Sequence, residues 1–345
     1  MASLYVASWT RGAGKTAMCV GLGRWLSKNS KKVGYFKPVE DATESGDARF
    51  VKEALRLDED AESLAPILIG LDDLKSEVAG GRLGDRVKRY FSEISSGKDV
   101  VLVEGVAGLS TDPSAADAAS QTVEALDAQV IIVVACAKDV PWDRIAAEGR
   151  RFGSRLLGAV LNRVPQNRLE DARASAAATR GDGIRLLGVL PEDRALLGVS
   201  VAEIARHLQA RSLCCEEGMS EMVENVMMGA MTPDSGADYF ARKDNKAVIV
   251  RGERPDMQLA ALATSTRCLI LTGGGEPIGQ VLSLAEDKGA PILVTDKDTL
   301  SAASDVEQAF VRARFQHQGK APIVDRILEE GFDFSALSEG LKLAG

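Results

Sequence analysis

The sequence predicts an α/β protein in which a doubly wound, mostly parallel sheet domain is followed by a smaller α/β domain. The length of 345 residues favours two domains, because a single hydrophobic core of this size is unusual. Short apolar runs alternate with helix-forming segments from the first residue onward. A polar segment at residues 211–221 then interrupts this alternation, and a second, shorter series follows it.

The first series contains apolar runs that we expect to be strands. Each run is nearly continuous in apolar residues, which is typical of strands buried on both faces of a parallel sheet. The runs comprise residues 4–8, 33–36, 99–105, 129–137, 156–164 and 185–191. Helix-forming segments lie between them, for example residues 14–28, 46–56, 114–126 and 141–152, and a helix at about 200–210 closes the series. This alternation indicates a doubly wound domain.

The second series repeats the pattern over a shorter length. Its expected strands are residues 246–252, 267–274 and 290–295, and its expected helices are residues 256–264, 277–287 and 298–310. A unit of about 100 residues is a common domain size. We therefore expect a first domain at 1–212, a second at 216–320, and a C-terminal helical tail at 321–345.

Charge and hydropathy exclude two classes of partner. The net charge is −8, and basic residues cluster only in SKNSKK at 27–32, so nucleic acid is not an expected partner. The longest apolar run, VIIVVACA at 130–137, is too short to span a bilayer. No signal peptide is visible at the start of the sequence. We therefore expect a cytoplasmic protein without membrane contact.

The cysteines and histidines do not indicate a metal centre or a nucleophile. Five cysteines occur without a CxxC pair, so neither a disulfide framework nor a zinc site is expected. The two histidines, His207 and His317, lie in no recognisable catalytic motif. Cys268 lies inside an apolar run and is expected to be a core thiol.

The segment SWTRGAGKT, residues 8–16, connects the first expected strand to the first expected helix. It ends like a phosphate-binding loop of the form GxxxxGK(S/T), although Trp9 stands where that pattern has its first glycine. Gly12 and Gly14 allow backbone N–H groups to face an anion, and the following helix N-terminus adds a partial positive charge. The segment therefore predicts a nucleotide site.

Five polar residues could act on a nucleotide at this site. Lys15 has the reach for the β- and γ-phosphates, and Thr16 has the hydroxyl that ligates magnesium in such loops. Lys37 and Glu104 each lie at the carboxyl end of an expected strand, where ligands collect in open α/β sheets. Asp47 begins an expected helix, where it serves either as a charge favourable to the helix dipole or as a metal ligand. Both interpretations of Asp47 remain open.

Five motifs together resemble a known family. GAGKT, GYFKPV, VLVEGVAG, GAVLNRV and LLGVLPED occur in the order and spacing of the dethiobiotin synthetase-like P-loop proteins. That group includes the ATPase domains of cobyrinate diamide synthases and the N-terminal domain of long phosphotransacetylases, and the last type is the most similar. Residues 216–320 resemble the DRTGG domain of those enzymes, for example in MMGAMTPDSGADYF and GAPILVTDKDT.

The resemblance implies a role for individual residues. The cofactors would be ATP and Mg²⁺, and the nucleotide would be held by Gly12, Ala13, Gly14, Lys15, Thr16, Ala17, Asn162 and Pro191. Asn162 would pair with the edge of adenine and Pro191 would line the base pocket. The metal ligands would be Thr16, Asp47 and Glu104. Lys15 and Lys37 would be the catalytic residues, with Lys37 stabilising an anion that is being phosphorylated.

The loop departs from the family pattern on its substrate side. Dethiobiotin synthetases have a glycine at the position of Ser8 and a threonine at the position of Arg11, and Trp9 is unusually bulky. Binding of the triphosphate survives these changes, because the N–H groups from Gly12 to Thr16 remain. The changed residues Ser8, Trp9 and Arg11 lie on the substrate side of the loop, so they bear on what the nucleotide is used for.

Two functions remain open. One is a regulatory nucleotide and metabolite sensor with weak ATPase activity, which the resemblance to the front half of phosphotransacetylases favours. The other is an ATP-dependent ligase that phosphorylates a carboxylate or carbamate, which Lys15, Lys37 and Glu104 keep possible. The glutaminase motif GxCxG of cobyrinate-type amidases is absent from the sequence.

The expected partners follow from the same resemblance. Besides the nucleotide, a small anionic metabolite could bind the backbone of the glycine-rich turn TGGGEP at 272–277, which equally suits a tight packed turn. A homodimer is expected because family members pair across the face that carries the nucleotide. An acetyl-transfer enzyme is a further expected partner.

Overall fold

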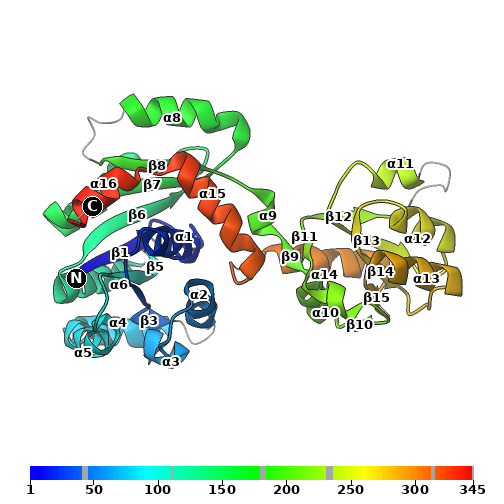
Figure 1. Cartoon of the computed structure of the whole chain (residues 1–345), viewed down its shortest axis with the longest axis horizontal. Helices are drawn as coiled ribbons and strands as arrows, with labels where there is room; N and C mark the ends of the chain where they lie inside the picture. Colours follow the sequence, from blue (N-terminus) through cyan, green and yellow to red (C-terminus); the bar gives the residue numbers. More distant parts are fainter. Residues whose placement is uncertain (41–45, 111, 179–183, 231–235, 312–314, 344–345) are drawn as a thin grey trace. The chain divides into compact units, whose positions relative to one another are not determined.

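The computed structural model divides the chain into two compact units (Figure 1). Unit 1 comprises Met1–Glu192 and Phe315–Gly345, and unit 2 comprises Asp193–Arg314. The structure describes residues 1–40, 46–110, 112–178, 184–230, 236–311 and 315–343.

Unit 1 is built on a parallel six-stranded sheet whose order is β2-β5-β1-β6-β7-β8. The strands are β1 (Ala2–Ser8), β2 (Val33–Phe36), β5 (Val100–Gly108), β6 (Gln129–Ala135), β7 (Leu156–Val164) and β8 (Leu186–Pro191). They correspond to the six apolar runs of the first series. Because the strand order reverses direction on either side of β1, the loop after β1 lies at a position where ligands bind in doubly wound sheets.

Helices cover the sheet of unit 1. They are α1 (Lys15–Lys28), α2 (Asp47–Leu55), α3 (Ala61–Leu64), α4 (Leu71–Ala79), α5 (Leu83–Ser95), α6 (Pro113–Leu126), α7 (Trp142–Gly149), α8 (Leu169–Ala178), α15 (Ala321–Gly331) and α16 (Phe334–Gly340). Within the described residues of unit 1, 3-10 helices occur at Arg150–Arg155, Gln166–Arg168 and Gln318–Lys320, and a short parallel pair is formed by β3 (Val39–Glu40) and β4 (Ile67–Leu68). Central strand residues such as Leu4 and Leu102 are fully buried.

The helices expected as a separate tail at 321–345 pack into unit 1. A Cβ added to Gly21 of α1 would lie 2.3 Å from Leu328 Cδ1 of α15, so the glycine permits close approach of the two helices. Trp25 stacks on Phe334 with ring centroids 4.2 Å apart. The sequence pattern shows that α15 and α16 are helical, but only this long-range packing assigns them to the first domain.

Unit 2 is a five-stranded sheet whose order is β10-β15-β14-β13-β12. The strands are β10 (Arg211–Ser212), β12 (Asn225–Met228), β13 (Lys246–Arg251), β14 (Thr266–Thr272) and β15 (Ile292–Val294), and only β10 is antiparallel to its neighbour. A separate antiparallel pair is formed by β9 (Val199–Ser200) and β11 (Met222–Val223). The helices are α9 (Arg194–Leu197), α10 (Val201–Leu208), a 3-10 helix at Glu216–Ser220, α11 (Gly236–Phe240), α12 (Pro255–Leu262), α13 (Gly279–Lys288) and α14 (Thr299–Val311).

The division between the units lies at Glu192 and not at residue 212, where the sequence pattern predicts it. Helix α10, expected to close the first domain, instead places Ile204 and Leu208 in a buried cluster with Ile270 and Val306 of unit 2. The polar segment after it contains β10, which pairs with β15. The apolar face of α10 decides the boundary, because that face is buried against unit 2.

None of the helices in the described ranges has the length and apolar character needed to cross a membrane.

Replacing Leu328 by alanine should destabilise unit 1 without affecting unit 2. Leu328 is only 1% exposed and packs against the glycine of α1, so the truncation leaves a cavity. We expect the free energy of unfolding to fall by about 2–5 kcal/mol. The measurement is urea denaturation followed by tryptophan fluorescence, because Trp9, Trp25 and Trp142 all lie in unit 1.

The matched control is Leu68→Ala in β4 of unit 1, where the side chain is 57% exposed. Its effect should stay within about 0.5 kcal/mol. An unchanged transition in Leu328→Ala would show that α15 is not part of the cooperative core of unit 1.

Candidate functional site

The loop between β1 and α1 has the backbone of a phosphate-binding loop. Gly12 and Gly14 have φ angles of +71° and +106°, which side-chain-bearing residues rarely adopt. Gly14 is the N-cap of α1, and no side chain caps the helix. The first N–H groups of a helix have no partners within the helix, so those of α1 face the loop as donors for an anion.

The residue that departs from the loop pattern, Trp9, is integrated into the base of the loop. Its side chain is buried, its N–H donates to Val133 O at 2.9 Å, and its carbonyl accepts from the Ser110 hydroxyl at 2.8 Å. The Arg144 guanidinium lies 5.8 Å from the centre of its ring. The bulky residue therefore anchors the loop to β6 and to the segment that follows β5.

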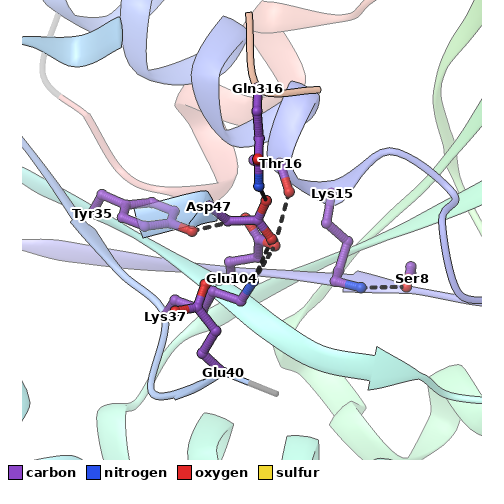
Figure 2. Close-up of polar contacts among 9 residues, drawn as sticks. All are labelled: Ser8, Lys15, Thr16, Tyr35, Lys37, Glu40, Asp47, Glu104 and Gln316. Atoms are coloured by element: carbon purple, nitrogen blue, oxygen red, sulfur yellow. Dashed lines mark hydrogen bonds and ion pairs between the residues drawn. The ribbon is translucent and has the colours of Figure 1, made fainter. Parts of the chain in front are cut away.

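Lys15 lies at the start of α1, and its Nζ donates to Ser8 Oγ at 3.0 Å (Figure 2). Loss of hydration lowers the pKa of Lys15, against the attraction of Glu104 and together with repulsion from Lys37. A lysine ammonium held by one neutral hydroxyl in these surroundings gains strongly from an anionic partner.

Thr16 and Tyr35 both donate to Glu104. Thr16 Oγ1 lies 3.0 Å from Glu104 Oε1, and Tyr35 OH lies 2.9 Å from Glu104 Oε2. Glu104 is 2% exposed at the carboxyl end of β5, and burial raises the pKa of its carboxyl, which Lys37 opposes. The two hydroxyls fix both oxygens of this carboxylate.

Lys37 follows β2 and lies among three carboxylates (Figure 2). Its Nζ donates to Asp47 Oδ2 at 2.5 Å and lies 3.5 Å from Glu40 Oε1 and 3.5 Å from Glu104 Oε1. Burial by itself lowers the pKa of Lys37, but the attraction of Glu104 and Asp47 outweighs it and raises the pKa above its ordinary value. Within the described part of the chain, the buried Glu40 Oε1 has no hydrogen-bond partner.

The expected metal ligands, Thr16, Asp47 and Glu104, have the oxygen donors that Mg²⁺ prefers. One cation, the Lys37 ammonium, already contacts both Asp47 and Glu104, so the two carboxylates are close enough to share a cation. Among the described residues there is no group of three or more His, Cys, Asp or Glu side chains that could enclose a metal. Magnesium is commonly bound through one or two carboxylates together with nucleotide phosphates, so the oxygen donors of Thr16, Asp47 and Glu104 would suit it.

Asn162 lies near the carboxyl end of β7, and Pro191 ends the neighbouring strand β8. Asn162 Nδ2 donates to Ala13 O at 2.8 Å, so it contacts the loop directly. Pro191 is the last residue of β8, and its side chain is half-buried. Ala17 lies in the first turn of α1. The structure thus brings Asn162 to the phosphate-binding loop.

Four contacts were not predicted from the sequence. Tyr35 lies within the motif GYFKPV and Glu40 directly follows it, and the spacing of Glu40 three residues after Lys37 was an available signal. Ser8 was noted only as a departure, whereas it is the partner of Lys15. Gln316, which donates to Asp47 Oδ1 at 3.0 Å, has no signal in the local sequence.

A family model described as an AAA domain matches residues 2–200, which is more than half of the chain. The chain belongs to this family. A second model, described as a DRTGG domain, matches residues 203–309. The AAA domain and the DRTGG domain thus meet near the start of α10.

Curated relatives are phosphate acetyltransferases. The protein of Pseudomonas putida is 25% identical over 332 residues, which cover 89% of this chain and 47% of the relative. That of Pseudomonas aeruginosa is 24% identical over 373 residues, covering 98% of this chain and 52% of the relative. The chain therefore spans about half the length of the curated relatives it matches.

Among solved structures, the MinD cell division protein of Aquifex aeolicus is similar over 57% of this chain and 85% of its own, with 18% identity and a TM-score of 0.38. This score is low, so the α/β fold of the AAA domain rests on the strand order described above.

Substituting alanine for Gly14 should disrupt the loop of the AAA domain more than the same change at Gly12. A Cβ at Gly14 would lie 2.5 Å from Asn162 Nδ2, whereas a Cβ at Gly12 meets nothing within 4 Å. Gly12→Ala carries only the strain of a positive φ, about 1–2 kcal/mol. Gly14→Ala should lower the free energy of unfolding more than Gly12→Ala does. The measurement is urea denaturation without nucleotide.

The double variant Gly14→Ala/Asn162→Ala isolates the clash. Removing the Asn162 side chain should recover part of the loss, so the double variant should be more stable than the sum of the two single effects predicts. Strictly additive effects would mean that Gly14 and Asn162 do not contact each other.

Proposed function

We propose that the chain is a Mg-ATP-binding regulatory sensor with weak ATPase activity, of the type represented by the N-terminal half of phosphate acetyltransferases. The observation that carries the proposal is the preassembled cluster at the loop, in which Lys15, Thr16, Glu104, Asp47 and Lys37 are linked to one another or to the loop. The match to an AAA domain followed by a DRTGG domain supports the same conclusion.

The nucleotide is held through its phosphates. The N–H groups from Gly12 to Ala17 at the start of α1 serve as donors, and Lys15 exchanges its contact with Ser8 for one with a phosphate oxygen. Thr16, Asp47 and Glu104 hold Mg²⁺, which supplies charge neutralisation at the phosphates when bound.

The charges around Lys37 favour a sensor over a ligase. A ligase needs Lys37 to receive an anionic carboxylate or carbamate. Lys37 instead lies within 3.5 Å of oxygens from Glu40, Asp47 and Glu104, and burial makes these charges effective on one another. The Lys37 ammonium is therefore already paired with carboxylates of the protein, which disfavours its pairing with a substrate anion.

Adenine selectivity is assigned to Asn162, with Pro191 lining the base pocket. A primary amide has two N–H donors and one acceptor. One N–H of Asn162 donates to Ala13 O, so the second N–H and the carbonyl oxygen remain to pair with the acceptor and donor on the edge of adenine.

The partners are also part of the proposal. The family resemblance supports a homodimer and an acetyl-transfer enzyme as the regulated partner, since the relatives are phosphate acetyltransferases. A small anionic metabolite is assigned to the glycine-rich turn of unit 2, where Gly273 and Gly274 have φ angles of +80° and +71°.

Replacing Lys15 by methionine should weaken Mg-ATP binding by one to two decades. Methionine keeps the length of the side chain and removes its charge, and a hydrogen bond to a charged group contributes about 1.5–3 kcal/mol. The measurement is isothermal titration calorimetry. The control is Lys88→Met on the exposed side of α5, which should bind Mg-ATP like the unchanged protein.

The same preparations distinguish the two functions by turnover. We expect slow ATP hydrolysis that does not respond to bicarbonate and a diamine, and this hydrolysis should be lost in Lys15→Met. Stoichiometric ATP-dependent carboxylation of the diamine would establish the ligase instead. Equal affinity of Lys15→Met and Lys88→Met for Mg-ATP would rule out the nucleotide site.

Replacing Asn162 by alanine should reduce the preference for ATP over GTP more than it reduces the dependence on magnesium. The substitution removes the amide that pairs with adenine, whereas the metal ligands are untouched. Competition of ATP and GTP for the protein, measured with a fluorescent nucleotide at two magnesium concentrations, checks this. An unchanged preference would place the adenine pocket elsewhere.

A further inference from the structure

The segment in which the chain re-enters unit 1, residues 315–318, lies along α2. Phe315 packs edge-on against Phe50, with ring centroids 5.4 Å apart and an interplanar angle of 89°. Gln318 Nε2 lies 3.2 Å from Glu53 Oε2. Phe50 and Glu53 are three residues apart, so the segment follows one face of the helix.

Gln316 lies between these two contacts and reaches the N-terminus of α2. Its Nε2 donates to Asp47 Oδ1 at 3.0 Å, and Figure 2 shows its side chain pointing at Asp47 from the side opposite Lys37. Asp47 Oδ2 accepts from Lys37. Each oxygen of the carboxylate thus has its own donor, and the two donors fix the plane of the carboxylate.

The backbone next to Asp47 is shaped for this contact. Gly46 has a φ of +125°, and a Cβ there would lie 3.3 Å from Gln316 Nε2, closer than most side chains tolerate. A glycine at this position lets the amide of Gln316 approach the carboxylate. Gln316 is half-buried, so its hydrogen bond is partly shielded from water.

We propose that Gln316 is a positioning residue for the metal ligand Asp47, so that the segment returning from unit 2 sets the affinity of the site for Mg²⁺. This inference rests on the proposed function, in which Asp47 holds the metal. Carboxylates that ligate metals are themselves hydrogen-bonded, and loss of such an outer partner typically costs 10–100-fold in metal affinity. Gln316 provides that outer hydrogen bond for Asp47.

The geometry separates this role from general support of the fold. Phe315 supplies the apolar contact that attaches the segment to α2, and Gln318 supplies a polar contact remote from the carboxylate cluster. If Gln316 only held the segment in place, its loss would affect metal-free and metal-dependent nucleotide binding alike. If Gln316 positions Asp47, its loss weakens only the metal-dependent part of nucleotide binding, because only that part uses Asp47.

The test replaces Gln316 by methionine, which fills a similar volume but cannot donate to Asp47. Mn²⁺ is titrated as the probe by electron paramagnetic resonance in the presence of a saturating non-hydrolysable ATP analogue. We expect the dissociation constant for Mn²⁺ to rise about 10–100-fold. The affinity for the same analogue in the presence of a chelator, measured by calorimetry, should stay within about twofold.

Gln318→Met on the same segment is the matched control and should change neither quantity. Urea denaturation of both variants verifies that unit 1 is folded, and Gln316→Ala should reproduce the loss of Mn²⁺ affinity if methionine packs poorly. Unchanged Mn²⁺ affinity in Gln316→Met, or an equal loss with and without metal, would overturn the positioning role.

Asp47→Ala distinguishes failure of this inference from failure of the proposed function. If Asp47→Ala weakens the affinity for Mn²⁺ and Gln316→Met leaves it unchanged, the metal site is retained and only the role of Gln316 is rejected. Unchanged Mn²⁺ affinity in Asp47→Ala would reject the metal site and this inference with it.

Discussion

The ammonium of Lys37, surrounded by carboxylates from β3, α2 and β5, is the interaction on which the candidate site depends. A buried charge is stable only when it is paired, and removing one partner of such a group is costly. The segment from Lys37 to Asp47 must therefore meet the carboxyl end of β5, which is more than 50 residues away in sequence, at one point. Because Glu104 also accepts from Thr16, the same network fixes the start of α1 and with it the phosphate-binding loop.

Much of the fold and the centre of the site could be predicted, because both depend on short-range patterns. The six strands of unit 1 are continuous apolar runs, and a strand buried on both faces needs no other information. Lys15 and Thr16 end a loop whose glycines and lysine match the end of a phosphate-binding pattern, and the structure gives these glycines positive φ angles. Lys37 and Glu104 could be placed together because the carboxyl ends of parallel strands share one edge of a sheet.

What could not be predicted depends on contacts between distant parts of the chain. Helix α10 has an apolar face that either unit could have covered, and only the packed structure assigns it to unit 2. Gln316 is a polar residue between two helical segments, with nothing around it in sequence that indicates Asp47, 269 positions away. Asn162 was associated with the base by family resemblance, whereas its contact with Ala13 depends on how closely β7 approaches the loop.

The return of the chain to unit 1 has a consequence for biosynthesis. On the ribosome, residues 193–314 emerge before α15 and α16, so unit 2 has its whole sequence available while unit 1 still lacks two of its helices. Domains usually complete folding in order from the N-terminus. Here the surface of α1 around Gly21 and Trp25 stays uncovered until Leu328 and Phe334 have been translated. The nascent unit 1 thus exposes an apolar surface on α1 during that interval, although its own synthesis begins first.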